Sequence, residues 1–181
     1  DNAIKVAYDF YMQHPDETLI VVTADHETGG MALGNSDYTL NLKVLAEQKC
    51  SSDLLSDQLS ALQKEAGKHL TWEQVKEVIS KNTGLYTVVE ISKEEDQLLQ
   101  AAFGQMMQHQ GVEKSLYKDI NALASKALAL LNQKSRLGWT SKGHTASAVP
   151  VFAIGVGAER FTGWHDNSEI APLIYEATQS Y

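Results

Sequence analysis

A short apolar run that ends in three polar residues constrains the fold of this chain more than any other feature. Leu19 to Val22 is rich in isoleucine and valine, too short for a buried helix, and bounded by Pro15 before it and Gly29-Gly30 after it. Such a run is typical of a buried strand and suits the centre of a parallel sheet. Asp25-His26-Glu27 follows directly, at the end of the strand where open α/β sheets bind their ligands.

The polar residues after this strand have the chemistry of metal ligands. Asp25 offers a carboxylate oxygen and His26 an imidazole nitrogen, and zinc accepts both. The alternative is that Asp25 caps the following turn and His26 is an ordinary half-buried histidine. A second histidine favours the metal reading, because His144, within Gly143-His144-Thr145, also lies beside a predicted strand, at 149–155.

These two stretches resemble the C-terminal part of the alkaline phosphatases. That family carries T-A-D-H-E-T-G-G after one strand and G-H-T before another, and both motifs stand here in the family's order, at 23–30 and 143–145. The similarity covers residues 1–34 and 138–181, while 35–137 stands where the family carries variable, crown-like insertions. The resemblance implies an α/β fold: a fragment of a three-layer core, discontinuous in sequence, with a mainly helical insert.

The resemblance also implies a site with two zinc ions in the complete enzyme. Asp25 and His26 would ligate one zinc and His144 the other, and the family's magnesium ligands are not in this chain. In the family, a serine attacks phosphorus to give a phosphoenzyme, which water then hydrolyses. Four further residues are candidates for contacting the metal ligands and fixing their orientation: Glu27, Thr28, Thr145 and His165.

Several catalytic features of the family have no counterpart in this sequence. No Asp is followed directly by Ser, as in the family's nucleophile segment, and no Asp is followed four residues later by His, as in its other zinc-ligating stretch. No catalytic residue is therefore assigned in this chain. We read it as the C-terminal part of a phosphatase and predict that, alone, it has no more than trace activity and weak zinc affinity.

Composition and charge limit the partners. The net charge of −8 argues against nucleic acid, and no run approaches the roughly 20 apolar residues that span a bilayer. The resemblance implies a phosphate monoester substrate, a periplasmic or secreted location, and a homodimer in the complete protein. Two alternatives stay open: a non-catalytic helical interaction module on a retained phosphatase scaffold, and another superfamily member, a phosphodiesterase or sulfatase.

Periodic apolar positions and capping motifs predict the remaining elements. Thr71-x-x-Gln74 and Ser92-x-x-Glu95 are capping boxes, and Asn167 or Ser168 would cap the last helix. A strand is expected at 31–33, a turn at 34–37, and a strand or extended link at 86–91. The expected helices are 1–13, 51–66, 71–82, 92–107, about 117–134 and 168–179.

Overall fold

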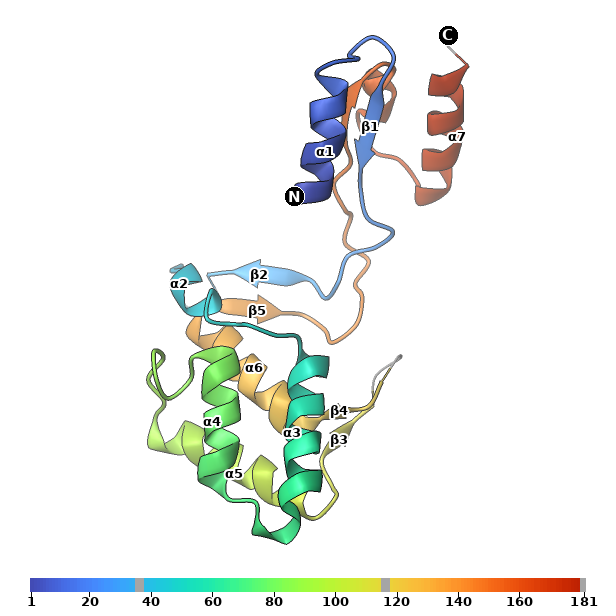
Figure 1. The fold of residues 1–181 in the computed structure, drawn as a ribbon. Helices are drawn as coiled ribbons and strands as arrows, with labels where there is room; N and C mark the ends of the chain where they lie inside the picture. The colour runs from blue at the N-terminus through green and yellow to red at the C-terminus, as the bar shows by residue number, and fades with distance from the viewer. Residues whose placement is uncertain (35–37, 115–117, 180–181) are drawn as a thin grey trace. The chain divides into compact units, whose positions relative to one another are not determined.

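The computed structural model describes residues 1–34, 38–114 and 118–179 and divides the chain into two compact units (Figure 1). Asp1–Gly30 and Thr140–Tyr181 form the first, which we call the ligand-bearing unit, and Met31–Trp139 forms the second, the helical unit. The division of the sequence into a family core and an insert at 34 and 137 stays a prediction. None of the described helices is long and apolar enough to cross a membrane.

Two strands form the sheet of the ligand-bearing unit. β1 (Leu19–Val22) pairs with β6 (Phe152–Gly155) in antiparallel register, with Leu19 opposite Gly155 and Val22 opposite Phe152. The predicted strands exist, but the expectation of parallel neighbours is wrong for this pair. An apolar run indicates that a strand is covered on both faces and carries no information about the direction of its partner.

Two helices flank this pair in Figure 1, α1 (Asn2–Tyr11) and α7 (Asn167–Thr178), and a short 3₁₀ helix η2 (Ala158–Phe161) follows β6. The cap of α7 is not Asn167 or Ser168 but Asp166. Its carboxylate accepts from the Ser168 N–H at 2.9 Å, while the Glu169 side chain accepts from the Asp166 N–H at 2.7 Å. The reciprocal pair is a capping box one residue earlier than expected.

The helical unit contains the four predicted longer helices: α3 (Ser52–Ala66), α4 (Trp72–Thr83), α5 (Lys93–Met107) and α6 (Ala122–Lys134). Both predicted capping boxes are present, at the starts of α4 and α5. Gly84 ends α4 in the left-handed conformation, with φ of 69°, which a residue with a side chain rarely adopts. These helices pack against one another in Figure 1.

Short elements account for most differences from the sequence prediction. The expected strand at 31–33 is confirmed as β2 (Met31–Leu33), but its antiparallel partner β5 (Leu137–Trp139) was not predicted. Residues 86–91 form a turn and link rather than a strand. Further elements that the prediction lacked are α2 (Leu42–Leu45), η1 (Gly67–His69), β3 (Val112–Glu113) and β4 (Ile120–Asn121).

The last helix of the helical unit begins later than predicted. α6 starts at Ala122, because the Asn121 side chain caps it by accepting from the Leu123 N–H at 2.9 Å. The predicted start, Tyr117, lies outside the described residues, as do residues 35–37 of the turn expected at 34–37.

Burial is concentrated in the helical unit. Its core joins all four longer helices, and the largest fully buried apolar side chains there are Leu55, Leu59, Val75, Ile79, Leu85, Leu99, Leu123 and Leu131. Among the described residues of the ligand-bearing unit, only Phe161 and Ala177 are buried hydrophobics. Every residue of β1 is only half-buried, and α1 buries none.

Candidate metal centre

The antiparallel pairing of β1 with β6 brings the two sequence motifs to one end of the sheet. The chain leaving β1 runs beside the chain entering β6, and the Thr23 hydroxyl donates to the Pro150 carbonyl at 3.3 Å. Further on, the Thr140 N–H donates to the Gly29 carbonyl at 2.9 Å and its hydroxyl to the Gly30 carbonyl at 3.0 Å. Hydrogen bonds therefore fasten the two segments together on both sides of Asp25-His26-Glu27.

The two predicted histidine ligands lie against each other. The ring centroids of His26 and His144 are 3.7 Å apart, with 43° between the ring planes. Both Nδ1 atoms contact the backbone carbonyl oxygen of Glu27, at 2.8 Å from His26 and 3.0 Å from His144. A carbonyl oxygen only accepts, so each ring carries its proton on Nδ1 and, when neutral, keeps the lone pair of Nε2 available.

Asp25 completes a pair of donors with His26. Its Oδ1 accepts from the His26 N–H at 3.1 Å, and its Oδ2 lies 3.4 Å from His26 Nε2. Both of these atoms are acceptors when the histidine is neutral, so their approach calls for a cation or a proton between them. Two tetrahedral zinc ligands at ordinary bond lengths lie about 3.3 to 3.4 Å apart, so the spacing fits zinc.

The described residues do not complete a metal site by themselves. Within 1–34, 38–114 and 118–179, no three His, Cys, Asp or Glu side chains are grouped so that they hold one ion. Asp25 and His26 converge as a pair, and His144 stacks beside them. The donor set therefore fits part of a zinc site and requires further ligands.

The Glu27 side chain joins the two motif segments. One carboxylate oxygen accepts the N–H groups of Gly29, at 2.9 Å, and Gly30, while the other accepts the N–H of Thr145. Desolvation acts to raise the pKa of Glu27, but these backbone hydrogen bonds, together with one from the Thr145 side chain, outweigh it and lower the pKa to about 2. The carboxylate is ionised at neutral pH.

Gly30 is required by close packing at the crossing of the two segments. Its φ of +61° lies in the left-handed region, and a Cβ there would approach Thr140 Oγ1 to 2.8 Å and Thr145 Cγ2 to 3.1 Å. The second glycine of the motif therefore permits the contact that the Thr140 hydrogen bonds make.

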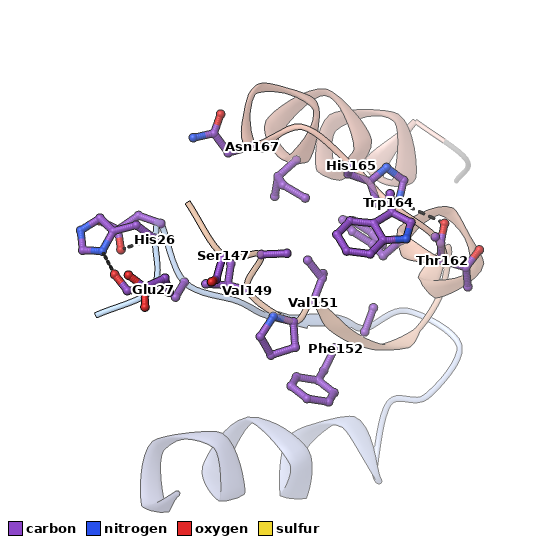
Figure 2. Close-up of a pocket in the computed structure, with 18 of the residues that line it drawn as sticks. His26, Glu27, Ser147, Val149, Val151, Phe152, Thr162, Trp164, His165 and Asn167 are labelled. Atoms are coloured by element: carbon purple, nitrogen blue, oxygen red, sulfur yellow. Dashed lines mark hydrogen bonds and ion pairs between the residues drawn. The ribbon is translucent and has the colours of Figure 1, made fainter. Parts of the chain in front are cut away.

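The other predicted residues divide into two groups. Thr145 lies in the site through its bond to Glu27, whereas the Thr28 side chain is exposed. His165 lies away from His26 in Figure 2: its Nε2 contacts the Thr162 carbonyl at 3.1 Å, and its Nδ1 lies 4.0 Å from a Glu169 oxygen.

An open cavity connects these groups within the ligand-bearing unit. It has a volume of about 990 Å³ and Asp25 is among its lining residues. His26 and Glu27 lie at one end of it and Trp164 and His165 at the other (Figure 2). Thr140 is a site residue that the sequence did not single out. It lies three residues before the G-H-T motif at 143–145, but only the fold shows that its backbone meets Gly29.

Comparison with known proteins identifies the family. A profile described as "Alkaline phosphatase" matches residues 1–180. The chain belongs to the alkaline phosphatase family. This confirms the resemblance and supports a hydrolase of the phosphatase type.

Similar proteins include two from Bacillus subtilis. The chain is 29% identical to alkaline phosphatase 4, covering 97% of the chain and 32% of that protein, and 29% identical to alkaline phosphatase 3, covering 99% and 34%. The crystal structure of a cold-active alkaline phosphatase from a Shewanella species superposes with a TM-score of 0.68 at 29% identity, over 97% of this chain and 37% of that one. That structural match confirms the alkaline-phosphatase-like α/β fold. The chain thus spans about a third of these relatives.

Proposed function

We propose that this chain carries the zinc-ligating C-terminal part of an alkaline phosphatase that hydrolyses phosphate monoesters. Asp25 and His26 would hold one zinc ion and His144 the second. One observation carries the proposal: two histidines from distant segments share a carbonyl acceptor through Nδ1 and keep both Nε2 atoms for metal, with Asp25 Oδ2 3.4 Å from one of them. Membership of the family supports the same reading.

Each residue of the site has a distinct task in this proposal. Zinc, when bound, would supply Lewis-acid stabilisation of the oxygens on phosphorus. The Asp25 carboxylate contributes negative charge that favours the cation, and the Glu27 carbonyl orients both imidazoles. The open cavity beside Asp25 leaves room for the ester, and Val149, Val151 and Phe152 form an apolar part of its lining.

The attacking group would come from another part of the protein. Asp25, His26 and His144 are assigned as ligands, so the chain contributes no nucleophile in this proposal, and the serine implied by the family lies in a segment that this sequence does not contain. Magnesium would be held by ligands that are not in this chain. We propose that the complete protein is a periplasmic or secreted homodimer, as the resemblance implies.

Titration of the metal-free chain with zinc, with calorimetry as the readout, tests the metal assignment. We expect weak binding that His26→Ala and His144→Ala each reduce. The matched control is His69→Ala, which removes an exposed histidine from η1 of the helical unit and is expected to leave binding unchanged. Equal loss in all three variants, or no loss in any, would contradict the assignment.

Hydrolysis of p-nitrophenyl phosphate tests the activity. The chain alone is expected to show no more than trace turnover with zinc present, while the longer protein that contains the nucleophile segment is expected to be active. Robust turnover by this chain that His144→Ala abolishes would overturn the claim that it lacks the nucleophile. A longer protein that stays inactive and takes up no zinc at Asp25, His26 and His144 would favour the non-catalytic scaffold.

A further inference from the structure

We propose that Glu27 is a positioning residue that locks His26 and His144 in one tautomer. We call this arrangement the lock, and both the side chain and the backbone carbonyl of Glu27 contribute to it. Its side chain fastens the two motif segments to each other, and its backbone carbonyl then accepts the Nδ1–H of both rings. The tautomer claim depends on this geometry alone, while its benefit for zinc binding rests on the proposed function.

The side-chain part of the lock depends on having two acceptor oxygens. Oε2 accepts from the N–H groups of Gly29 and Gly30 in the first segment, and Oε1 accepts from the N–H of Thr145 in the second. Glutamine has nearly the same shape but only one acceptor oxygen, so its NH₂ group would face an N–H donor at one of the two places. Glu27→Gln therefore breaks one side of the clamp with little change in volume.

The backbone part of the lock fixes which ring nitrogen carries the proton. Neutral imidazole carries hydrogen on either nitrogen, and the choice follows the hydrogen bond that the ring makes. The Glu27 carbonyl lies 2.8 Å from Nδ1 of His26 and 3.0 Å from Nδ1 of His144. His26 is next to Glu27 in the chain, whereas His144 reaches this carbonyl only because its segment is held beside Glu27. We therefore expect His144 to depend on the clamp more than His26.

A tautomer measurement on the metal-free full chain tests the inference. Long-range ¹H–¹⁵N correlation spectra of the imidazoles distinguish Nδ1–H from Nε2–H rings at a pH about 2 units above the ordinary histidine pKa of about 6.5. In the native chain, the neutral ring of His144 is expected to be in the Nδ1–H form, and Nδ1 of His26 is expected to carry a proton whether or not a second proton lies between its Nε2 and Asp25 Oδ2. Glu27→Gln is expected to replace the Nδ1–H form of His144 by signals of the Nε2–H form.

The chain offers a matched control in another Glu–His pair. His14 Nδ1 lies 2.7 Å from a Glu17 oxygen, so Glu17→Gln changes the partner of one histidine without touching the candidate site. It is expected to alter the His14 signals and leave those of His26 and His144 in place. Backbone spectra of the helical unit report whether each variant is folded.

Two results would overturn the proposal. The first is an Nε2–H form of His26 or His144 in the native chain, which needs no variant and so stands even if Glu27→Gln does not fold. The second is an unchanged Nδ1–H form of His144 in folded Glu27→Gln. If the native chain binds zinc, Glu27→Gln is also expected to weaken that binding about 10- to 100-fold. Because the spectra require neither zinc nor substrate, failure of the phosphatase proposal would leave their result intact.

Discussion

The two units of this chain differ in what their secondary structure packs against. The helical unit surrounds a core in which Leu59, Ile79 and Leu123 are completely buried. In the ligand-bearing unit, Phe152 of β6 is 64% exposed and Val6 of α1 is 72% exposed. Both units contain helices and strands, but among the described residues the large buried core belongs to the helical unit.

This difference separates the unit that supplies most of the folding stability from the unit that carries the candidate metal ligands. Burial of apolar surface is the main favourable term in folding, so the helical unit supplies most of the stability. The ligand-bearing unit holds the polar site on a two-stranded sheet, which by itself is marginal in water. Its exposed apolar side chains fit a unit that further strands or a partner would complete.

The sharpest way to break this comparison is to truncate one leucine in each environment of the same helix. Leu59→Ala empties a fully buried position of α3 and should lower the free energy of unfolding by about 2–5 kcal/mol. Leu54→Ala, at a position 49% exposed in α3, should cost well under about 1 kcal/mol. Urea denaturation followed by circular dichroism measures both, and similar losses would mean that the core is not where the structure places it.

Hydrogen exchange compares the units directly. Amides of β1 and β6 should open more readily than those of α6, by about 2 kcal/mol or roughly 30-fold in exchange rate, because α6 lies in the buried core and the strand pair does not. Mass spectrometry of peptides from each element measures the rates. Equal protection in both would show that the ligand-bearing unit is as stable as the helical one.

Sequence and structure agree best where the interactions are local. Thr71 and Ser92 were predicted as helix caps from the sequence alone, since the residues of a capping box lie within one helical turn, and both boxes are present. The antiparallel direction of β6 was not recognisable, because it depends on a partner more than 100 residues away.

The candidate site shows the same division. The motifs predicted Asp25, His26 and His144, and the fold brings the segments that carry them together. The clamp formed by Glu27 depends on Thr145, and no local signal in either segment shows that they meet. His165 was predicted as a neighbour of the ligands from its place in the sequence, but its ring turns to the Thr162 carbonyl.

A smaller effect concerns a hydrogen-bonded cluster inside the helical unit. The Tyr86 hydroxyl donates to Asp96 Oδ1 at 2.8 Å, and the Trp72 Nε1–H donates to the same oxygen at 3.3 Å. Tyr86→Phe should lower stability by about 1–2 kcal/mol at neutral pH, since the bond is to a charged group.

The cluster also has a pH signature. Burial, followed by the hydrogen bond to Asp96, raises the pKa of Tyr86 above its ordinary value. The stabilisation that the Tyr86–Asp96 hydrogen bond gives to the folded state is therefore complete below the unfolded pKa of tyrosine, about 10. It is lost as the pH rises through the pKa of Tyr86 in the folded state. Thermal unfolding at neutral and strongly alkaline pH measures the difference, and a constant gap between native chain and Tyr86→Phe would contradict the cause assigned to the shift.

The smallest effect concerns Glu95 at the start of α5. Desolvation raises its pKa, but the hydrogen bond from Lys134, at 2.8 Å, and that from the Ser92 N–H outweigh it, so the pKa is lowered overall. Its stabilisation is present above the unfolded pKa of about 4.3 and declines as the pH falls through the folded value. Glu95→Gln should cost about 0.5–1 kcal/mol at pH 7 and less in acid, as measured by thermal unfolding. A cost that grows in acid would contradict this.

The pairing of β2 with β5 affects both the folding of the chain and how far the helical unit can diverge in evolution. It places Met31 opposite Trp139, so the first and last residues of the helical unit leave it side by side. Residues 31–139 form a long loop between the segment that carries Asp25 and His26 and the segment that carries His144. Once the backbone hydrogen bonds between β2 and β5 form, this loop is closed. The entropic cost of loop closure then no longer opposes contact between the two segments. Insertions or deletions within the helices then change the length of a sealed loop without moving its ends. The unit can diverge in sequence and size while the spacing of Asp25, His26 and His144 is kept.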